Sequence, residues 1–378
     1  MVTQSSKECI ANRANEFKMN KTEYYDEAIS FENLYSGLKR SCRNVRWKDS
    51  VVSYEANGLK NTYKLRQSLL DETYKISPYH EFTIYEPKVR EIVATRIKDR
   101  QFQRSLCDNG LYDDITESFI LDNPACQKGK GNDVALDRLT EMMRRYYQKY
   151  GSKGFFLKCD IHHYFPSTDH QVASEAVHKR IDDTRAAKAV DKIIESFGAD
   201  GKGIGLGSQV SQLVELAVLD AMDHYIKEKL HIKYYARYMD DFVLIHQDKQ
   251  YLQKCRQKIE EFLIPLKLEL NKKTTLQPLH SGIRFLKWRF KYSSTGKVLR
   301  LMEYNKVTAE QHKLAKLWER ERLGTVPLGA TEESIDSWIA NAQRGDTFHY
   351  KRKVIHYYEQ LTGKKYVFKS CKKSKKDL

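Results

Sequence analysis

Two adjacent aspartates, Asp240 and Asp241, lie between two stretches with the composition of β-strands, residues 233–238 and 242–245. A tight hairpin turn usually contains Asn-Gly or Asp-Gly, because these residues tolerate a positive φ, and no glycine is present at this turn. Successive side chains of a strand point to opposite faces, so both carboxylates reach one side only if the turn redirects them. An ordinary polar turn explains this pair when it is taken alone.

A third acid, Asp160, ends a separate apolar stretch, residues 154–160, which has the pattern of a buried strand. A lone carboxylate there is costly unless a cation or a hydrogen-bonding partner accompanies it. If the two strand units are neighbours in one sheet, Asp160 and Asp240 converge at its edge. Carboxylates of this kind hold Mg²⁺ while substrate phosphates complete the shell of the ion. Two such ions, about 3.5–4 Å apart, activate an attacking hydroxyl and stabilise a leaving pyrophosphate.

The chain is strongly basic. Its 378 residues include 66 Lys and Arg against 50 Asp and Glu, which gives a formal net charge of +16. Such an excess favours a polyanionic partner, since cations that neutralise phosphates release counterions. A merely soluble basic surface is the alternative. The apolar share of 40% is enough for a sizeable core and excludes a largely disordered chain. Charge and acids together indicate nucleotidyl transfer.

The sequence points to the cytoplasm. No stretch approaches the roughly 20 apolar residues that cross a bilayer, and the first residues lack the apolar segment of a signal peptide. The 7 cysteines are scattered and form no CxxC pair, so we expect reduced thiols. We therefore expect a cytoplasmic protein without a membrane partner.

Helical and strand-like patterns are interleaved without regular βαβ units, which predicts an α+β fold. Strand patterns cover residues 82–86, 154–160, 233–238, 242–245, 268–270 and 283–290. Helical patterns cover most of 1–80, then 91–108, 132–149, 210–229 after a glycine-rich loop at 201–207, 249–264, and the basic region from about 306 onward.

Two of these segments resemble the catalytic motifs of reverse transcriptases, the right-hand polymerases of retroelements. Residues 156–165, FLKCDIHHYF, resemble the first motif, in which an aromatic residue follows the aspartate by five positions. Residues 238–241, YMDD, resemble the YxDD motif. The resemblance covers roughly residues 30–350. It implies an N-terminal extension with the start of the fingers (1–80), fingers (81–153), a palm with an antiparallel sheet and helices (154–295), and a helical thumb with a basic tail (296–378).

The resemblance implies roles for residues of these two motifs. Asp160 and Asp240 would be the principal ligands of two Mg²⁺ ions, with Mn²⁺ as the alternative metal and Asp241 in support. Ile161 would offer its backbone to the metal or the triphosphate. Phe165 stands where the family has the side chain that excludes a ribose 2′-OH, and core packing is the alternative. Tyr238, which opens the YxDD motif, is expected to bind substrate.

Residues 206–212, LGSQVSQ, resemble the motif that lines the nucleotide and the template. Glycine lets a backbone approach a phosphate or base, and a helix N-terminus favours anions. A plain connection from loop to helix is the alternative. The resemblance implies that Gly207, Ser211 and Gln212 contact the nucleotide or the template. Group II intron and retron enzymes usually have QGxxxSP here, whereas LGxxxSQ resembles diversity-generating retroelements and unclassified bacterial lineages, some linked to phage defence.

Basic residues on either side extend the resemblance. Lys88 and Arg90, two apart on an extended segment, can face one side and suit a triphosphate, although a solvated surface pair is the alternative. Residues 268–274 resemble the motif with a lysine near the leaving pyrophosphate. Lys273 is the candidate general acid, ahead of Lys272.

Two further segments resemble duplex-binding parts of the family. Residues 285–288, FLKW, resemble the primer-grip turn, in which Lys287 replaces the usual glycine. The expected thumb mixes aromatic and basic residues, as a duplex-tracking surface would, although a helical bundle with charged outer faces is the alternative. These residues are Trp338, Arg344, Tyr350, Lys351, Arg352 and Lys353.

The sequence therefore predicts an RNA-directed DNA polymerase that uses dNTPs to extend a primer on RNA. The first hypothesis is a bacterial, defence-associated enzyme that makes cDNA from a dedicated noncoding RNA. The second is the mutagenic polymerase of a diversity-generating retroelement. The third, from another class, is a catalytically idle nucleic-acid-binding module. An accessory protein or a second copy of the chain is a further expected partner.

Overall fold

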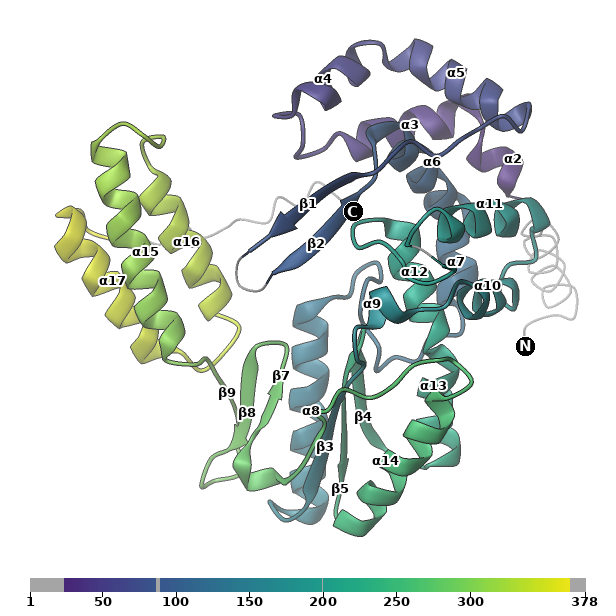
Figure 1. Ribbon diagram of the computed structural model, residues 1–378. Coiled ribbons are helices and arrows are strands. Elements are labelled where there is room, and N and C mark those ends of the chain that lie inside the picture. The colour runs from purple at the N-terminus through teal and green to yellow at the C-terminus, as the bar shows by residue number, and fades with distance from the viewer. Residues whose placement is uncertain (1–23, 86–88, 199, 368–378) are drawn as a thin grey trace, which may run out of the picture. The chain divides into compact units, whose positions relative to one another are not determined.

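The computed structural model describes residues 24–85, 89–198 and 200–367 (Figure 1). The chain divides into two compact units. The first contains the chain up to Gly131, Cys159–Phe242 and Gln253–Thr274, and the second contains Asn132–Lys158, Val243–Leu252 and the chain from Thr275 onward. The predicted mixture of helices with short sheets is confirmed. The boundaries of fingers, palm and thumb stay predictions. Among the described residues, no helix has both the length and the apolar character needed to cross a bilayer.

The first unit begins with a helical layer in which α3 packs against α5 and α6. Gly37 of α3 allows this approach, because a Cβ there would meet the Gln101 carbonyl oxygen at 2.7 Å. The Gln101 side chain is buried and donates to Leu34 O at 3.1 Å and to Thr62 Oγ1 at 2.7 Å. The helices are α2 (Tyr25–Ala28), α3 (Phe31–Ser41), α4 (Asp49–Ala56), α5 (Gly58–Leu70) and α6 (Ile97–Leu106).

A hairpin of β1 (His80–Ile84) and β2 (Arg90–Ala94) precedes α6, with Ile84 paired to Arg90 (Figure 1). This confirms the strand expected near residues 82–86 but corrects the helix expected to begin at residue 91. Residues 91–94 pair with β1, and the β-branched Ile92 and Val93 suit a strand. The helix starts only at Ile97.

The rest of the first unit is mainly helical, and aspartates cap two of its helices. Asp169 accepts from the backbone N–H groups that begin α10, and Asp183 does so at α11. The elements are η1 (Cys107–Leu111), α7 (Tyr112–Thr116), α9 (Tyr164–Ser167), α10 (His170–His178), α11 (Thr184–Glu195), α12 (Gln209–Val218), α13 (Asp220–His224) and η2 (Tyr225–Lys229).

The helix expected at 210–229 is not continuous. It divides at Leu219, where φ is −94° and ψ is 0°, into α12 and α13. The two acids that follow the break form ion pairs: Asp220 with Arg180 at 2.8 Å and Asp223 with Arg237 at 2.6 Å. The apolar pattern spans the break, so periodicity alone misses it.

A four-stranded sheet has the order β4-β5-β3-β6. The two strand units of the sequence analysis are therefore neighbours, which meets the condition stated there for Asp160 and Asp240 to converge. β3 pairs antiparallel with β6, from Phe155 opposite Pro278 to Lys158 opposite Thr275. The strand expected at 268–270 is reduced to a single bridge between Ile161 and Leu270. The strands are β3 (Phe155–Asp160), β4 (Tyr234–Tyr238), β5 (Asp241–His246) and β6 (Thr275–Pro278).

The second unit contains α8 (Asn132–Tyr150) and a three-stranded sheet, whereas α14 (Lys249–Leu263) belongs partly to each unit. The sheet has β7 (Ile283–Phe285), β8 (Trp288–Tyr292) and β9 (Val298–Leu301), and η3 (Leu279–Ser281) precedes it. Between β7 and β8, Leu286 has φ 48° and Lys287 has φ 69°. The expected turn at 285–288 is therefore present, with Lys287 in the left-handed conformation that glycine adopts more easily.

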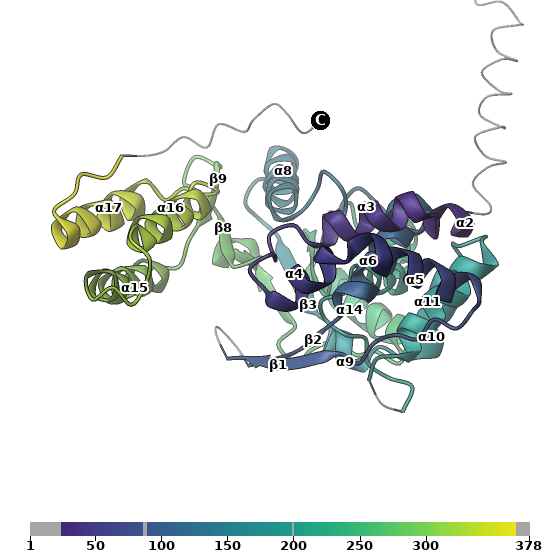
Figure 2. The ribbon, with the colours of Figure 1, turned by 90° about the horizontal axis from the view of Figure 1, so that it is seen from above.

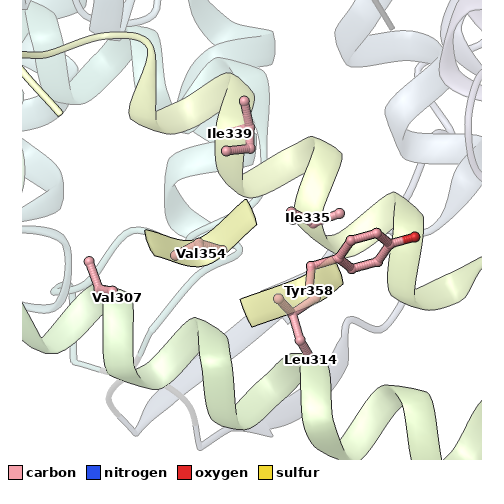
Figure 3. Close-up of a cluster of buried hydrophobic side chains, with 6 residues drawn as sticks. All are labelled: Val307, Leu314, Ile335, Ile339, Val354 and Tyr358. Atoms are coloured by element: carbon pink, nitrogen blue, oxygen red, sulfur yellow. The ribbon is translucent and has the colours of Figure 1, made fainter. Parts of the chain in front are cut away.

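Three helices close the second unit: α15 (Asn305–Arg322), α16 (Ala330–Ala342) and α17 (Phe348–Thr362). They lie side by side in Figures 1 and 2. Apolar side chains from all three helices meet in a common core, as Figure 3 shows. This core contains Val307, Leu314, Ile335, Ile339, Val354 and Tyr358.

Glu321 holds the connection from α15 to α16. Its carboxylate accepts from Gly329 N at 2.9 Å, Thr331 N at 3.0 Å and Thr331 Oγ1 at 2.7 Å. These backbone hydrogen bonds stabilise the charged form and lower the pKa of Glu321. A lowered carboxyl pKa contributes stability above the unfolded pKa, and this contribution is lost as pH falls through the folded pKa.

We expect Glu321→Ala to lower the free energy of unfolding by about 1–3 kcal/mol, because it leaves buried donors without their acceptor. Denaturant unfolding at pH 7 measures this difference. Glu319→Ala, at an exposed position of the same helix, is the matched control and should change stability by less than about 0.5 kcal/mol. Equal losses in the two variants would contradict the assigned role. The difference should shrink only when the pH falls below about 4.5, the ordinary pKa of a glutamate side chain.

Candidate active site

The turn between β4 and β5 carries the two adjacent aspartates. Met239 has φ 57°, in the left-handed region, and Asp241 begins β5. Asp240 and Asp241 are both half-buried. A non-glycine residue at positive φ costs free energy and persists only where the surroundings hold it. Here Arg237 Nη1 donates to Met239 O at 2.9 Å, and Cys126 Sγ lies 3.8 Å from Met239 Sδ.

The end of β3 meets this turn. Ile161 N donates to Asp240 O at 3.2 Å, so the residue after Asp160 is hydrogen-bonded to the backbone of Asp240. The two chain segments therefore adjoin through a backbone hydrogen bond, and the convergence of the Asp160 and Asp240 carboxylates stays a prediction. The functions assigned to Asp160, Ile161, Asp240 and Asp241 stay predictions.

Asn271 is a site residue that the sequence reasoning missed. Its backbone N donates to Asp160 O at 2.7 Å, and its side-chain Nδ2 donates to Asp160 Oδ2 at 3.1 Å. Its Oδ1 accepts from Lys273 N at 3.0 Å. Asn271 thus links the Asp160 carboxylate to the segment that carries Lys272 and Lys273, whose side chains are both exposed. In the sequence, only its place within residues 268–274, two positions before Lys273, pointed to a role for Asn271.

Asp160, Asp240 and Asp241 have the ligand chemistry that a divalent ion such as Mg²⁺ prefers. Within the described ranges, no group of three His, Cys, Asp or Glu side chains could hold a metal by itself. Mg²⁺ does not require one, because it binds through one or two carboxylates with water and phosphate oxygens completing its shell. Half-buried carboxylates on two adjoining segments fit that mode better than they fit a cage made of protein ligands alone. His162, which is close to Asp160 in the sequence, pairs with Glu269 at 2.9 Å and is not needed as a metal ligand.

A buried carboxyl, Glu215 of α12, lies close enough to the turn to interact with the charge of Asp240. It is 0% exposed, and burial raises its pKa to about 8, with the charge of Asp240 adding to the rise. Thr168 Oγ1 donates to Glu215 Oε2 at 3.0 Å, and Tyr164 Oη donates to the Glu215 backbone oxygen. Burial therefore disfavours the charged form of Glu215 beside Asp240.

Phe165, the candidate sugar-selecting residue, follows Tyr164 in α9. Its ring is half-buried and meets the Tyr164 ring edge-on, with centroids 5.9 Å apart. Its carbonyl accepts from Ile204 N at 2.8 Å, which fastens its backbone to the glycine-rich loop. Partial exposure leaves ring surface available to a ligand, as the predicted sugar-selecting role requires.

The glycine-rich loop leads into α12 as predicted. Gly207 has φ 117°, and a Cβ there would lie 3.5 Å from Val93 O of β2. Ser208 caps the helix: its Oγ accepts from Ser211 N at 3.4 Å and donates to Gln103 Oε1 at 2.8 Å. The Ser211 hydroxyl is buried and has no hydrogen-bond partner among the residues that the structure describes, and the adjacent Gln212 is half-buried.

The remaining predicted site residues make few described contacts with the aspartate turn. Lys88 lies outside the described residues, and Arg90 begins β2. Tyr238 ends β4, where burial raises its pKa. In the expected thumb, Arg344 pairs with Asp133 at 2.7 Å. One cavity of about 550 Å³ on α17 is lined by His349, Arg352, Lys353, Ile355, His356 and Glu359.

Comparison with known proteins gives limited similarity. No protein family model matches the chain. The DNA polymerase III subunit alpha of Borreliella burgdorferi is 32% identical over 113 residues, which are 29% of this chain and 10% of that protein. This chain therefore spans a tenth of the length of that relative.

Two solved telomerase structures align over more of the chain. Telomerase from Candida albicans, in complex with a TWJ fragment of telomeric RNA, has a TM-score of 0.47 at 10% identity, covering 82% of this chain and 66% of that one. Apo telomerase from Candida tropicalis has a TM-score of 0.47 at 11% identity, covering 80% and 68%. At such scores the likeness carries no weight for function, which has to be argued from the residues of the site.

Proposed function

We propose that the chain is an RNA-directed DNA polymerase that extends the 3′-OH of a primer with dNTPs. The observation that carries this proposal is the hydrogen bond of 3.2 Å from Ile161 N to Asp240 O, which joins the two aspartate-bearing segments. The link from Asp160 through Asn271 to the segment of Lys273 supports it. The net charge of +16 suits a nucleic-acid partner.

In this proposal Asp160 and Asp240 hold two Mg²⁺ ions, with Asp241 in support and the Ile161 backbone beside them. Mn²⁺ is the alternative metal. When bound, such ions supply charge neutralisation and activation of the attacking hydroxyl. The chain contributes the positions of the carboxylates, which the β4–β5 turn and Asn271 fix before substrate binds.

Other residues bind the substrates. Lys88 and Arg90 are the proposed triphosphate contacts, and Phe165 excludes a ribose 2′-OH. Lys273 donates a proton to the leaving pyrophosphate. Template and incoming base are positioned by the remaining predicted contacts, which are Gly207, Ser211, Gln212 and Tyr238.

The biological role that we propose is a bacterial antiphage system in which the enzyme makes cDNA from a dedicated noncoding RNA. The LGxxxSQ sequence at residues 206–212 also fits the mutagenic polymerase of a diversity-generating retroelement. Selective misincorporation opposite template adenine is expected only of that second role, so the error spectrum of the purified enzyme distinguishes the two. Sequencing nucleic acid that co-purifies with the chain identifies the template.

Primer extension tests the proposed activity. We expect the purified full chain to extend a DNA primer on an RNA template with dNTPs and Mg²⁺, and to stop when EDTA removes the metal. A parallel reaction with rNTPs tests sugar selection. Binding of the primer–template without extension in Mg²⁺ or Mn²⁺ would contradict the proposal and leave a nucleic-acid-binding module.

A further inference from the structure

Arg237, in the strand that leads to the aspartate turn, is fully enclosed by protein. It lies in β4, its exposed fraction is 0%, and it is the largest of the fully buried side chains described. A guanidinium keeps its charge under all ordinary conditions, and removing it from water carries a large free-energy cost. Such a residue needs an anion and a full set of acceptors.

Asp223 of α13 is that anion. Arg237 Nε donates to Asp223 Oδ1 at 2.7 Å, and Nη2 donates to Asp223 Oδ2 at 2.6 Å, so the pair is bidentate. The Asp223 side chain is also 0% exposed, and Tyr235 Oη donates to its Oδ1 at 2.6 Å. Charge neutralisation accounts for two of the guanidinium nitrogens and leaves Nη1 for another partner.

Nη1 donates to Met239 O at 2.9 Å, and Nη2 also approaches Leu216 O of α12 at 3.5 Å. Met239 is the turn residue at φ 57°, and the next residue is Asp240. The peptide group held by Arg237 is therefore the one that joins Met239 to Asp240. The orientation of this peptide group sets the position of the Asp240 Cα atom, from which the carboxylate side chain extends.

The far side of Asp240 is fixed as well, because its carbonyl accepts from Ile161 N at 3.2 Å. Hydrogen bonds thus connect Asp223 to Arg237 and Arg237 to the Met239 carbonyl. The peptide bond leads from Met239 to Asp240, whose own carbonyl is hydrogen-bonded to Ile161, the residue after Asp160. The bond from Arg237 Nη1 to Met239 O connects the buried ion pair to this turn.

We propose that Arg237, held by Asp223, is a positioning residue that fixes the Met239–Asp240 peptide and thereby the Asp240 carboxylate for metal binding. This inference rests on the proposed polymerase function. A buried ion pair that serves folding alone is the competing explanation, and it predicts no effect on metal affinity once the variant is folded.

Three variants separate the two explanations. Arg237→Lys retains the charge beside Asp223, but one ammonium group cannot replace the fork and also reach Met239 O. The double variant Arg237→Met/Asp223→Leu removes both buried charges together, which is often neutral or stabilising, and it eliminates the bond to the turn. Gln101→Met is the matched control, because it removes a buried polar side chain whose hydrogen bonds are with Leu34, Thr62 and Tyr54, away from the turn.

The measurements are Mn²⁺ affinity by electron paramagnetic resonance, kcat and KM for dNTP in primer extension, and thermal unfolding of the full chain. We expect both Arg237 variants to fold and to lose about 10- to 100-fold in Mn²⁺ affinity and in kcat, since small misplacements of catalytic groups have effects of this size. Primer–template affinity should stay unchanged. Gln101→Met should lower the unfolding temperature only.

Mn²⁺ affinities of folded Arg237 variants that lie within twofold of the wild-type value would overturn the inference. A loss of Mn²⁺ affinity in Gln101→Met as large as in the Arg237 variants would overturn it too. If the wild-type chain extends no primer, the proposed function fails, and the Mn²⁺ comparison alone then decides the positioning role. Should the double variant not fold, Arg237→Lys gives the decision.

Discussion

Asp240→Asn is expected to abolish primer extension while the protein stays folded. Asparagine has nearly the shape of aspartate but loses the negative charge that a divalent ion requires. The loss of several kcal/mol of transition-state stabilisation corresponds to a fall in kcat of about 10³-fold or more. Because Asp240 is only half-buried, the free energy of unfolding should change by less than about 1 kcal/mol.

Single-nucleotide incorporation measures the effect on rate, and circular dichroism with denaturant unfolding measures folding. Asp71→Asn is the matched control, since Asp71 is an exposed aspartate at the end of α5. It should retain wild-type activity. Normal incorporation by folded Asp240→Asn would remove Asp240 from the catalytic site and leave the proposed chemistry without its principal ligand.

The second large effect is expected at Lys273. Removing a general acid typically lowers the rate about 10²–10⁴-fold, so Lys273→Ala should reduce kcat by that range. The pyrophosphate gains charge only as its bond breaks, so KM for dNTP should change little. The exposed side chain and the backbone bond from Lys273 N to Asn271 Oδ1 are compatible with a folded variant.

Lys272→Ala is the comparison that makes this result specific, because Lys272 is also exposed and adjoins Asn271. Pre-steady-state incorporation rates separate the chemical step from product release. A larger loss of rate for Lys272→Ala would move the general acid to Lys272. Unchanged chemistry in both variants would mean that water protonates the leaving group.

Local sequence patterns predicted much of the fold. The helices at 132–150 and 249–263 and the strand near residue 84 follow from periodicity, whereas the turn after Phe285 follows only from the resemblance to the primer-grip motif. Such patterns report which face of one element is apolar. They failed where tertiary contacts decide: residues 91–94 became a strand by pairing with β1, and the helix expected at 210–229 breaks at Leu219.

The amino-acid sequence already identifies the chemical groups of the candidate site: two adjacent aspartates, a third aspartate at the end of another apolar segment, and a basic chain around them. Folding brings Asn271 against Asp160, Glu215 within electrostatic reach of Asp240, and the Arg237–Asp223 pair into hydrogen-bonding distance of Met239 O. The physical reason is range. Composition and periodicity describe a residue and its near neighbours, whereas hydrogen bonds between residues that are distant in sequence exist only after the chain has folded.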